Sequence, residues 1–463
     1  MGSEQFRIEK DSMGEMKVPA NAYYGPQTQR AVENFPISGI RFSRPLIAAM
    51  GIIKGASAKA NSSLGLLDSK KMSAIVAATE EVRVGKLDEQ FVVDIFQTGS
   101  GTSTNMNANE VIAKRAQEIA GGDMKLHPND HVNMSQSSND VIPTAIHIAV
   151  ATQISSKLLP ALNNLKNSLA AKSKDFAHIV KTGRTHLQDA TPITLGQEFS
   201  GYQRQVELGI ERIERSLVAI LELPLGGTAV GTGLNTHPDF AKKAIAEIVS
   251  VTSLAFFEAK NHFEAQAAKD ALVEMSGQLR VVAVSLTKVA NDIRWLAAGP
   301  RCSLGEISIP EVQPGSSIMP AKVNPVIVES LLMACAQVIG NDAAVAFGGA
   351  TGSQFELNVM MPVMAHNILQ SIELLSNSAR NFSSRCIDGI KANEARIKEL
   401  AEANIATVTA LAPKIGYDLA AKVAKEAYQT GETLRQVALR HNVLPQEELD
   451  KALDLMAMTK PGL

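Results

Sequence analysis

One apolar repeat constrains the fold of this chain more than any other feature of the sequence. Between residues 272 and 293, apolar side chains recur alternately at every third and fourth residue. This spacing places all of them on one side of an α-helix, whereas a strand would bury alternate residues. A helix of about 27 residues has a length of roughly 40 Å. The repeat consists of Leu272, Met275, Leu279, Val282, Leu286, Val289 and Ile293.

Four other segments show the same kind of pattern. Residues 158–169 and 199–221 have apolar side chains at helical spacing, and we expect two further helices at about 325–347 and 362–382. Five long helices predict a bundle that also buries surface between subunits, because isolated rods of this length leave much apolar area uncovered. The composition agrees, because 45% apolar and only 4% aromatic residues suit helix packing better than β-sandwiches. We therefore expect an all-α protein.

The length of 463 residues is typical of about three domains. We expect a mostly helical N-terminal domain over residues 1–139, whose first 45 or so residues form an irregular arm because they contain several prolines and no long periodic run. The central domain of long helices then covers residues 140–395. A small helical domain follows over residues 396–463, where shorter apolar patterns are separated by glycine and proline.

Charge and cysteine usage exclude several classes of protein. The net charge of −2, with both signs interspersed, provides no field for a polyanion, so we expect no nucleic-acid partner. The three cysteines lie far apart, which argues against a disulfide framework or a cysteine-bound metal. No uninterrupted apolar run reaches membrane-spanning length, and acidic residues near the N-terminus argue against a targeting peptide. We therefore expect no membrane association and a cytoplasmic location.

Four polar stretches interrupt the helical pattern, and each is expected to end at a helix start. They are Ser100–Thr102 before a helix from Glu110, Ser135–Asp140 (SQSSND), Gly183–Gln188 (GRTHLQ) and Gln313–Glu329 (QPGSSIMPAKVNPVIVE). Each is also readable as an ordinary capped turn. Together they supply hydroxyls, amides, one histidine and one lysine, which suit the carboxylates of a small dicarboxylic acid. After the third stretch, Thr194 and Gln197 have the spacing of a capping box.

The last of these stretches predicts a mobile loop that feeds a helix. Asn324 suits the N-cap and Pro325 the first helical position. Lys322 precedes the cap, so its ammonium group could hold an anion together with free backbone N–H groups. Gly315 would let the chain approach a ligand closely. A plain linker followed by a capped helix is the alternative.

His186 is the candidate acid/base in the third stretch. A single histidine in a polar turn is often structural, and its neighbours offer no metal ligands. With a carboxylate to orient it, the imidazole could transfer protons near neutral pH. Glu329 is the carboxylate that we nominate, because it begins the helix behind the loop. Ser316 could act as a base only if positive charge and oriented N–H groups stabilised its alkoxide.

The stretch Gly315–Asn324 resembles the GSSxMPxKxN signature of the fumarase/aspartase superfamily. Segments that resemble class II fumarases extend along nearly the whole chain and follow the order of that family. They include RIEKDSMGEMKVP, QTGSGTSTNMNANEV, HPND, SQSSND, GRTHLQDATPITLGQEFSGY, GGTAVGTGLN, NDIRWLAAGPR and FELNV.

This resemblance implies a three-domain fold with a central five-helix bundle, which forms a twenty-helix core in a homotetramer. It implies that each active site is drawn from three subunits. It also implies the reversible hydration of fumarate to L-malate through an aci-carboxylate intermediate, without a metal or cofactor.

The resemblance also assigns roles to individual residues. Ser316 resembles the base that removes a proton from malate, and His186 paired with Glu329 resembles the acid/base that handles water. The stretch from Gly305 to Met319 resembles a loop that closes over substrate. The residues implied in binding the substrate carboxylates are Ser100, Thr102, Ser137, Ser138, Asn139, Thr185, Ser317, Lys322 and Asn324, and those of a secondary dicarboxylate site are His127, Pro128, Asn129 and Asp130.

Some positions are more typical of the sister enzyme, aspartate ammonia-lyase. Ala321 and Val326 stand where fumarases usually have glycine and threonine. In contrast, Ser138, Gly227 and Trp295 are typical of fumarases, and neither Ala321 nor Val326 provides a charged or hydrogen-bonding group for ammonium. Fumarate hydratase is therefore the leading hypothesis, aspartate ammonia-lyase is the first alternative, and a non-catalytic helical scaffold of the same fold is the second.

Overall fold

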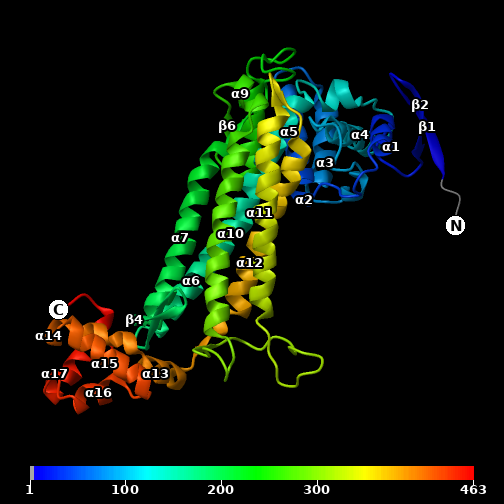
Figure 1. Cartoon of the computed structure of the whole chain (residues 1–463). Helices are drawn as coiled ribbons and strands as arrows, with labels where there is room; N and C mark the ends of the chain where they lie inside the picture. The colour runs from blue at the N-terminus through cyan, green and yellow to red at the C-terminus, as the bar shows by residue number, and fades with distance from the viewer. Residues whose placement is uncertain (1–4, 463) are drawn as a thin grey trace. The chain divides into compact units, whose positions relative to one another are not determined.

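The computed structural model describes residues 5–462 and consists mainly of helices (Figure 1). Its contacts divide it into two compact units. The first unit contains the residues up to Pro160 together with Ile210–Ala283 and Ala334–Ser376, and the second contains Ala161–Gly209, Val284–Met333 and the residues from Asn377 onwards. The three domains expected at 1–139, 140–395 and 396–463 stay a prediction, and residues 1–4 of the first lie outside the described part.

The five predicted long helices are all present, so the expected all-α class is confirmed. Every member of the repeat between residues 272 and 293 is at most 3% exposed, as expected for a seam that packs against neighbouring helices. The long helices are α6 (Leu159–Asp175), α7 (Leu195–Ile220), α10 (Asp270–Leu296), α11 (Val326–Gly352) and α12 (Met361–Arg385).

Polar side chains link neighbouring long helices inside each unit. In the first unit, Ser276 of α10 donates a hydrogen bond of 2.8 Å to Asp342 of α11. The amide of Asn341 in α11 donates to the Ser371 hydroxyl of α12 at 3.1 Å. In the second unit, the hydroxyls of Ser168 in α6 and Ser383 in α12 lie 2.7 Å apart. These buried and partly buried bonds fix the register of the helices in a way that apolar contacts alone do not.

The N-terminal arm is a regular β-hairpin and not the irregular segment that its prolines predicted. Strands β1 (Phe6–Asp11) and β2 (Gly14–Pro19) pair antiparallel, and the Arg7 guanidinium fixes the hairpin by donating to four backbone carbonyls downstream, including Tyr24 O at 2.7 Å. The other elements of the first unit are α1 (Pro26–Asn34), α2 (Arg44–Ser63), α3 (Ser69–Arg83), a 3-10 turn (Asp88–Gln90), α4 (Thr102–Ile119), a π-turn (Pro128–Val132), α5 (Ser138–Gln153), a second π-turn (Ile154–Leu158), β5 (Glu222–Leu223), α8 (Phe240–Thr252), β6 (Phe257–Glu258), α9 (His262–Ala267), β8 (Ser353–Gln354) and β9 (Leu357–Asn358).

The second unit contains a further hairpin and a C-terminal group of short helices. Strands β3 (Val180–Thr185) and β4 (Gln188–Thr194) pair antiparallel just before α7. The C-terminal helices have a small core of their own around Leu411, Val437 and Leu449. The remaining elements are β7 (Ile307–Ser308), a 3-10 turn (Ile387–Gly389), β10 (Lys391–Ala392), α13 (Glu394–Ala403), a 3-10 helix (Ile405–Ala410), α14 (Ala412–Ile415), α15 (Tyr417–Thr430), α16 (Leu434–Arg440), α17 (Gln446–Ala452) and a last 3-10 turn (Ala457–Thr459).

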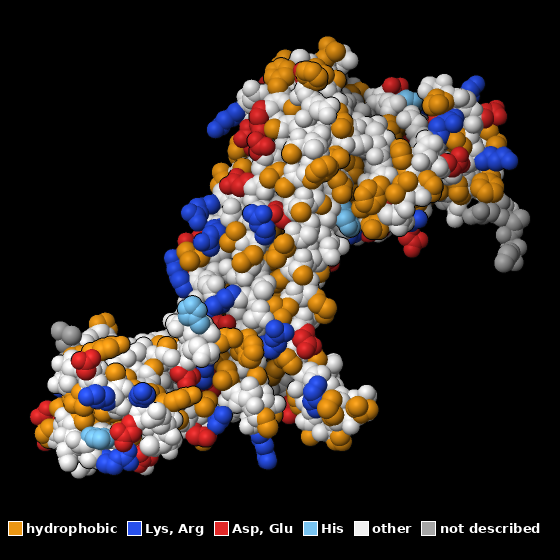
Figure 2. All heavy atoms as spheres, in the orientation of Figure 1, with side chains coloured by type: hydrophobic (Ala, Val, Ile, Leu, Met, Phe, Trp, Pro, Cys, Tyr) orange, Lys and Arg blue, Asp and Glu red, His pale blue; other side chains and the backbone are white. Residues whose placement is uncertain are grey.

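Two helical segments, Ser138–Asp175 and Val326–Gly352, are long and apolar enough to cross a membrane, although the sequence has no uninterrupted apolar run of that length. In the apolar 18-residue stretch of each segment, 61% and 44% of the stretch is buried inside the protein. Core helices of water-soluble proteins can be equally long and apolar. The second segment is α11, and hydrophobic side chains are exposed at many places on the face of the molecule that Figure 2 shows.

Candidate active site

Three predicted hydroxyls form one chain in the first unit. The Ser100 and Thr102 hydroxyl oxygens lie 2.8 Å apart, and the Thr102 oxygen lies 2.7 Å from the Ser138 oxygen. Thr102 is the first residue of α4 and Ser138 is the first residue of α5, so two helix N-termini meet at this chain. Helix N-termini favour anions through their free N–H groups and their dipoles. Two of the four polar stretches therefore lie side by side, and α4 begins at Thr102 and not at Glu110 as predicted.

The stretch that carries Ser100 cannot shift without a clash. A Cβ on Gly99 would lie only 1.8 Å from the Val359 carbonyl oxygen, so the chain passes directly against that backbone. The Met361 N–H also donates to Gly99 O at 3.1 Å. Gly101 has a φ of +73°, which turns the chain into α4. These contacts hold the Ser100 and Thr102 hydroxyls in place without a ligand.

The start of α5 is fixed by a buried carboxylate that the sequence did not single out. Asp140 is completely buried, and its carboxylate accepts from the N–H groups of Ser137, Gly226 and Thr228 at 2.9–3.0 Å. Burial raises the pKa of Asp140, while these three donors and the nearby Lys54 act in the opposite direction. Lys54 is itself buried, and desolvation lowers its pKa to about 7.

Ser137 and Asn139 then take defined positions around this carboxylate. Ser137 caps α5 in a capping box with Asp140, and its hydroxyl accepts from Asn139 N–H at 3.2 Å. The Asn139 amide donates to Ala229 O at 2.7 Å. The predicted binding residues of the first unit are therefore preorganised around one structural centre.

The predicted secondary site occupies a surface π-turn of the first unit. The His127 Nδ1 atom accepts from the backbone N–H groups of Asn129 and Asp130 at 3.3 and 3.1 Å. The side chains of His127 and Asp130 are 55% and 75% exposed. Together with Pro128, the turn borders a cavity of about 490 Å³ that extends towards β1 and α4. Among residues 5–462, no hydrogen bond joins this turn to the hydroxyl chain.

His186 occupies the tip of a tight hairpin in the second unit. Thr185 pairs with Gln188, and the two residues between them, His186 and Leu187, have φ values of +57° and +58°. Positive φ at both central positions is the geometry of a type I′ turn, which normally favours asparagine and glycine. Both side chains are exposed, so the turn presents the imidazole to its surroundings. The predicted capping box of Thr194 and Gln197 behind the hairpin is confirmed by hydrogen bonds of 2.9 and 3.0 Å.

The loop that carries Ser316 is closed mainly by contacts to itself. The Ser316 hydroxyl oxygen accepts from the N–H groups of Ile318 and Met319 at 3.3 and 2.9 Å. Two N–H donors aimed at one oxygen are the arrangement that stabilises an alkoxide. The Asn324 amide donates to Gly315 O at 2.6 Å, which joins the two ends of the loop. A Cβ on Gly315 would lie 2.0 Å from the Lys322 carbonyl oxygen, so the predicted close approach is to the loop itself.

Two expectations for the end of this loop are wrong. Helix α11 begins at Val326 and not at Pro325, and the Asn324 side chain closes the loop and does not cap the helix. Within the described range, the side chains of Ser317 and Lys322 make no hydrogen bond or ion pair, and both residues are exposed. They remain available to a ligand.

The predicted partnership of His186 with Glu329 is not formed within this chain. Glu329 lies in the first turn of α11 and is exposed. Among residues 5–462, no hydrogen bond or ion pair joins it to His186. The structure therefore brings together the hydroxyls of the first unit, whereas His186, Ser316 and Glu329 of the second unit stand on separate exposed elements. In the same described range, no group of three His, Cys, Asp or Glu side chains has a spacing that could hold a metal ion.

Comparison with known proteins gives consistent matches over the chain. A family model described as lyase matches residues 14–340, and one described as fumarase C C-terminus matches residues 408–460. Fumarate hydratase class II of Corynebacterium glutamicum is 56% identical over 464 residues, covering 99% of this chain and 97% of that protein. Mitochondrial fumarate hydratase of Saccharomyces cerevisiae is 55% identical over 454 residues, covering 97% and 93%. The crystal structure of class II fumarase from Schistosoma mansoni matches with a TM-score of 0.96 at 40% identity, covering 99% and 100%.

Proposed function

The chain belongs to the class II fumarate hydratase family, and from this premise we propose that it catalyses the reversible hydration of fumarate to L-malate by acid/base chemistry. The structural observation that supports this proposal is the hydroxyl chain of Ser100, Thr102 and Ser138 at two helix N-termini. Such a site favours a small carboxylate without a large fixed charge. Asn139 and Ser137 complete this part of the binding set.

In the proposed reaction, Ser316 removes a proton from the C3 carbon of malate. The two backbone N–H groups that point at its oxygen support this role, because they stabilise the negative form of the hydroxyl. Lys322 and Asn324, with Ser317, stabilise the aci-carboxylate that develops after proton loss. The segment from Gly305 to Met319 closes over the substrate.

His186 handles the water that leaves malate or attacks fumarate, with Thr185 binding substrate beside it. We propose that Glu329 orients the imidazole across a boundary between copies of the chain, because the two residues are exposed and unpaired with each other within one copy. A carboxylate on one ring nitrogen fixes the tautomer that presents the other to the water. The turn from His127 to Asp130 is proposed as a secondary dicarboxylate site.

The proposed assembly is a homotetramer with the long helices at its centre. The support is an exposed stripe on α11, in which Met333 is 69% and Phe347 is 61% exposed. Exposed Ala336, Gly340 and Ala343 lie between them at helical spacing. Apolar and small residues along one face of a long helix suit close packing against another helix. A cytoplasmic location and the absence of nucleic-acid or membrane partners are part of this proposal.

The assay that tests the function compares L-malate with L-aspartate as substrates of the purified protein. Both eliminations produce fumarate, which absorbs in the ultraviolet. A rise with malate alone supports the hydratase. A rise with aspartate alone would assign the ammonia-lyase, which Ala321 and Val326 resemble, and no rise with either would leave a scaffold.

Two variants test the assigned acid/base residues. Ser316→Ala and His186→Asn should each lower kcat by about 10²–10⁴-fold, the range for lost proton transfer, with the oligomeric state unchanged. Ser384→Ala and His178→Asn are the matched controls, because both residues are exposed and lie outside the proposed site. Near-normal turnover of either test variant contradicts the role given to that residue.

A further inference from the structure

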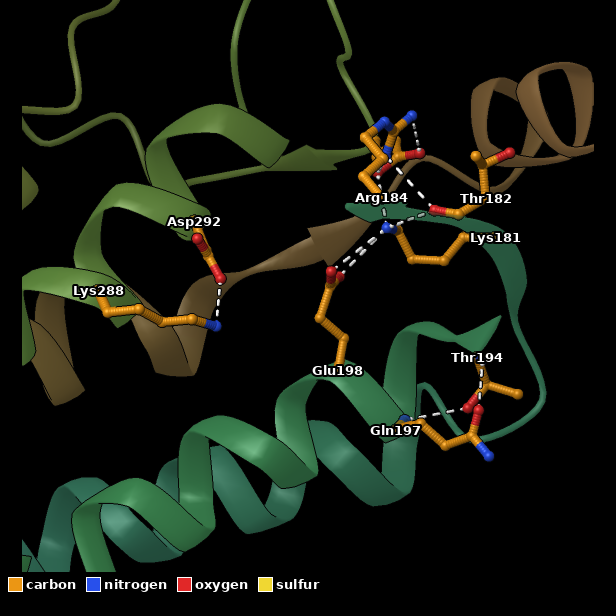
Figure 3. A network of polar contacts seen from close by, with 9 residues as sticks. Lys181, Thr182, Arg184, Thr194, Gln197, Glu198, Lys288 and Asp292 are labelled. Carbon is orange, nitrogen blue, oxygen red and sulfur yellow. Dashed lines mark hydrogen bonds and ion pairs between the residues drawn. The ribbon is translucent and has the colours of Figure 1, made fainter. Parts of the chain in front are cut away.

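Four charged side chains form a cluster at the stem of the His186 hairpin, and two of them are fully buried. The Arg184 guanidinium donates to both carboxylate oxygens of Glu306 at 3.0 Å, and the Lys181 ammonium lies 3.3 Å from the same carboxylate. Lys181 also lies 3.3 Å from the carboxylate of Glu198 (Figure 3). The side chains of Lys181 and Glu306 are 1% and 0% exposed. The two cations and two anions balance, so the cluster carries no net charge.

Such a cluster is a poor device for stability alone. Taking charges out of water costs about as much as their mutual attraction returns, and apolar side chains of similar volume often stabilise a protein equally well. What a bidentate arginine–carboxylate pair does provide is direction, because the planar fork fixes both distance and angle. A need for defined geometry therefore explains the cluster better than a need for folding stability.

The cluster joins three separate segments of the second unit. Lys181 and Arg184 belong to β3, and Glu198 belongs to the first turn of α7. Glu306 directly precedes β7, and its own backbone is held at both sides, since its N–H donates to Leu296 O at 2.9 Å and its carbonyl accepts from Asn393 N–H at 2.8 Å. The stem of the hairpin is thus attached to a rigid point at which the segment leading to Ser316 begins.

The tip of the hairpin needs such support because its backbone is strained. Residues with side chains at positive φ cost free energy and persist only where the surroundings determine them. His186 and Leu187 are two such residues in succession. A bulge at Gly183 interrupts the pairing just before Arg184, and a Cβ at Gly183 would lie 2.5 Å from the Thr191 carbonyl oxygen. The strained tip therefore sits directly above the stem that Glu306 holds.

We propose that Glu306, Arg184, Lys181 and Glu198 are positioning residues, which fix the His186 imidazole relative to the rest of the second unit. They touch neither the imidazole nor the proposed substrate, and they act through the backbone of the hairpin. This inference rests on the proposed function, because it requires that His186 transfers protons. The consequence is that the rate of proton transfer by His186 depends on the bonds that Arg184, two residues earlier in the chain, makes to Glu306.

The test replaces Arg184 by lysine in the full-length protein. Arg184→Lys keeps the charge balance of the cluster but loses the two parallel hydrogen bonds. We expect kcat to fall by about 10–100-fold, the range measured for supporting residues of a site, because His186 is no longer held in place. KM should change by less than about threefold, since the hydroxyls that bind the carboxylates are untouched.

The matched control is Arg115→Lys in the first unit. Arg115 also holds a carboxylate through two bonds, to Glu81 at 2.6 and 3.0 Å, but it supports no proposed site residue. This variant should retain the parental kcat. Thermal unfolding and size-exclusion chromatography of both variants show how much of any fall in kcat results from unfolded or dissociated protein.

The outcomes separate this inference from the proposed function. If His186→Asn loses turnover and Arg184→Lys does not, the cluster is only structural and the inference is wrong. If both arginine variants lower kcat equally, the effect is general destabilisation and the inference is again wrong. If His186→Asn keeps its turnover, the proposed role of His186 fails first. Should Arg184→Lys not fold, Glu306→Gln takes its place, because it keeps the shape of the carboxylate and removes its charge.

Discussion

The stretches around Ser137 and the loop around Ser316 are both polar, serine-rich and close to a helix start, yet the structure treats them differently. Asp140 ties the first to a distant backbone segment, through the N–H groups of Gly226 and Thr228, and is completely buried. The second is bonded mostly to itself, and Ile318 and Met319 within it are 83% and 49% exposed. Sequence composition does not distinguish a preformed binding surface from a closing segment, whereas the number of anchors to the rest of the fold does.

This difference predicts two kinds of variant. A change at an anchor of the Ser137 stretch should alter the free energy of unfolding, because it disturbs several elements at once. A change in the Ser316 loop should alter turnover and leave unfolding nearly untouched. The following substitutions break or sharpen that contrast.

The largest effect is expected for Asp140→Asn. The amide would direct an N–H group towards backbone N–H donors and leave Lys54 without its nearby carboxylate. Leaving a buried N–H donor without its charged acceptor costs about 1–3 kcal/mol of unfolding free energy for each donor, and Gly226 and Thr228 share one carboxylate oxygen of Asp140. Urea denaturation followed by circular dichroism measures the loss. Asp175→Asn, at an exposed position, should change the unfolding free energy by less than about 0.5 kcal/mol, and equal losses in both variants would contradict the anchoring role.

Gly183→Ala should have the next largest effect. Its Cβ would meet the backbone oxygen of Thr191 at 2.5 Å, so the hairpin must open. Overpacking of this kind costs about 1–3 kcal/mol, and the displaced His186 should lower kcat as well. Gly201→Ala is the control, because nothing lies within 4 Å of its added Cβ. This second variant should be neutral or stabilising by up to about 1 kcal/mol, and a similar loss in both would contradict the steric explanation.

The anchored region also predicts a pH dependence. The pKa of Lys54 is lowered by burial from 10.5 to about 7 in the folded protein. Between these values the unfolded chain binds a proton that the folded chain does not, so the free energy of unfolding should rise with pH across this window, by up to about 1.4 kcal/mol per pH unit. Below about pH 7 this lysine adds no further slope.

Urea denaturation at several pH values between about pH 7 and pH 10 tests this slope. Lys54→Met should reduce the slope but not abolish it, because burial lowers the pKa of Lys269 to about 7 as well and this group contributes over the same window. Lys157→Met, at an exposed position, should leave the slope unchanged. A slope that Lys54→Met leaves unchanged would contradict the assignment to Lys54.

Ala321→Gly is expected to have the smallest effect. Ala321 has a φ of +64°, a conformation that glycine adopts without steric cost, and this explains why a glycine suits the position. The gain in unfolding free energy should stay below about 0.5 kcal/mol, because the loop is held mainly by its own contacts. Ser253→Gly, with a φ of +58° at the end of α8, should gain up to about 1 kcal/mol. The preference for malate over aspartate should not change, and a switch would show that Ala321 selects the leaving group.

The long helices could be predicted from the sequence because their apolar spacing is unbroken over many turns. The hairpins could not. In β1 the side chains alternate between exposed and half-buried positions, so its period-two pattern carries little apolar contrast. The turn at His186 lacks the asparagine or glycine that marks a type I′ hairpin, because the strain of two ordinary residues is supported from a distance. The residues next to the turn do not indicate that distant residues support it.

The candidate site divides along the same line. Its hydroxyls and amides could be nominated from the sequence because they cluster in short stretches with a recognisable composition. The residues that hold them were missed, since Asp140 meets Gly226 and Arg184 meets Glu306 across large separations in the chain. A buried charge has no signature of its own until its partner is known.

The apolar stripe on α11 also bears on how the protein behaves in a cell. With that stripe covered by other copies, as proposed, part of the free energy that keeps each copy folded comes from association and therefore depends on protein concentration. Dilution, low expression or slow assembly would lower the stability of the fold without any change in its sequence. The abundance of the protein thus becomes one of the determinants of its own lifetime.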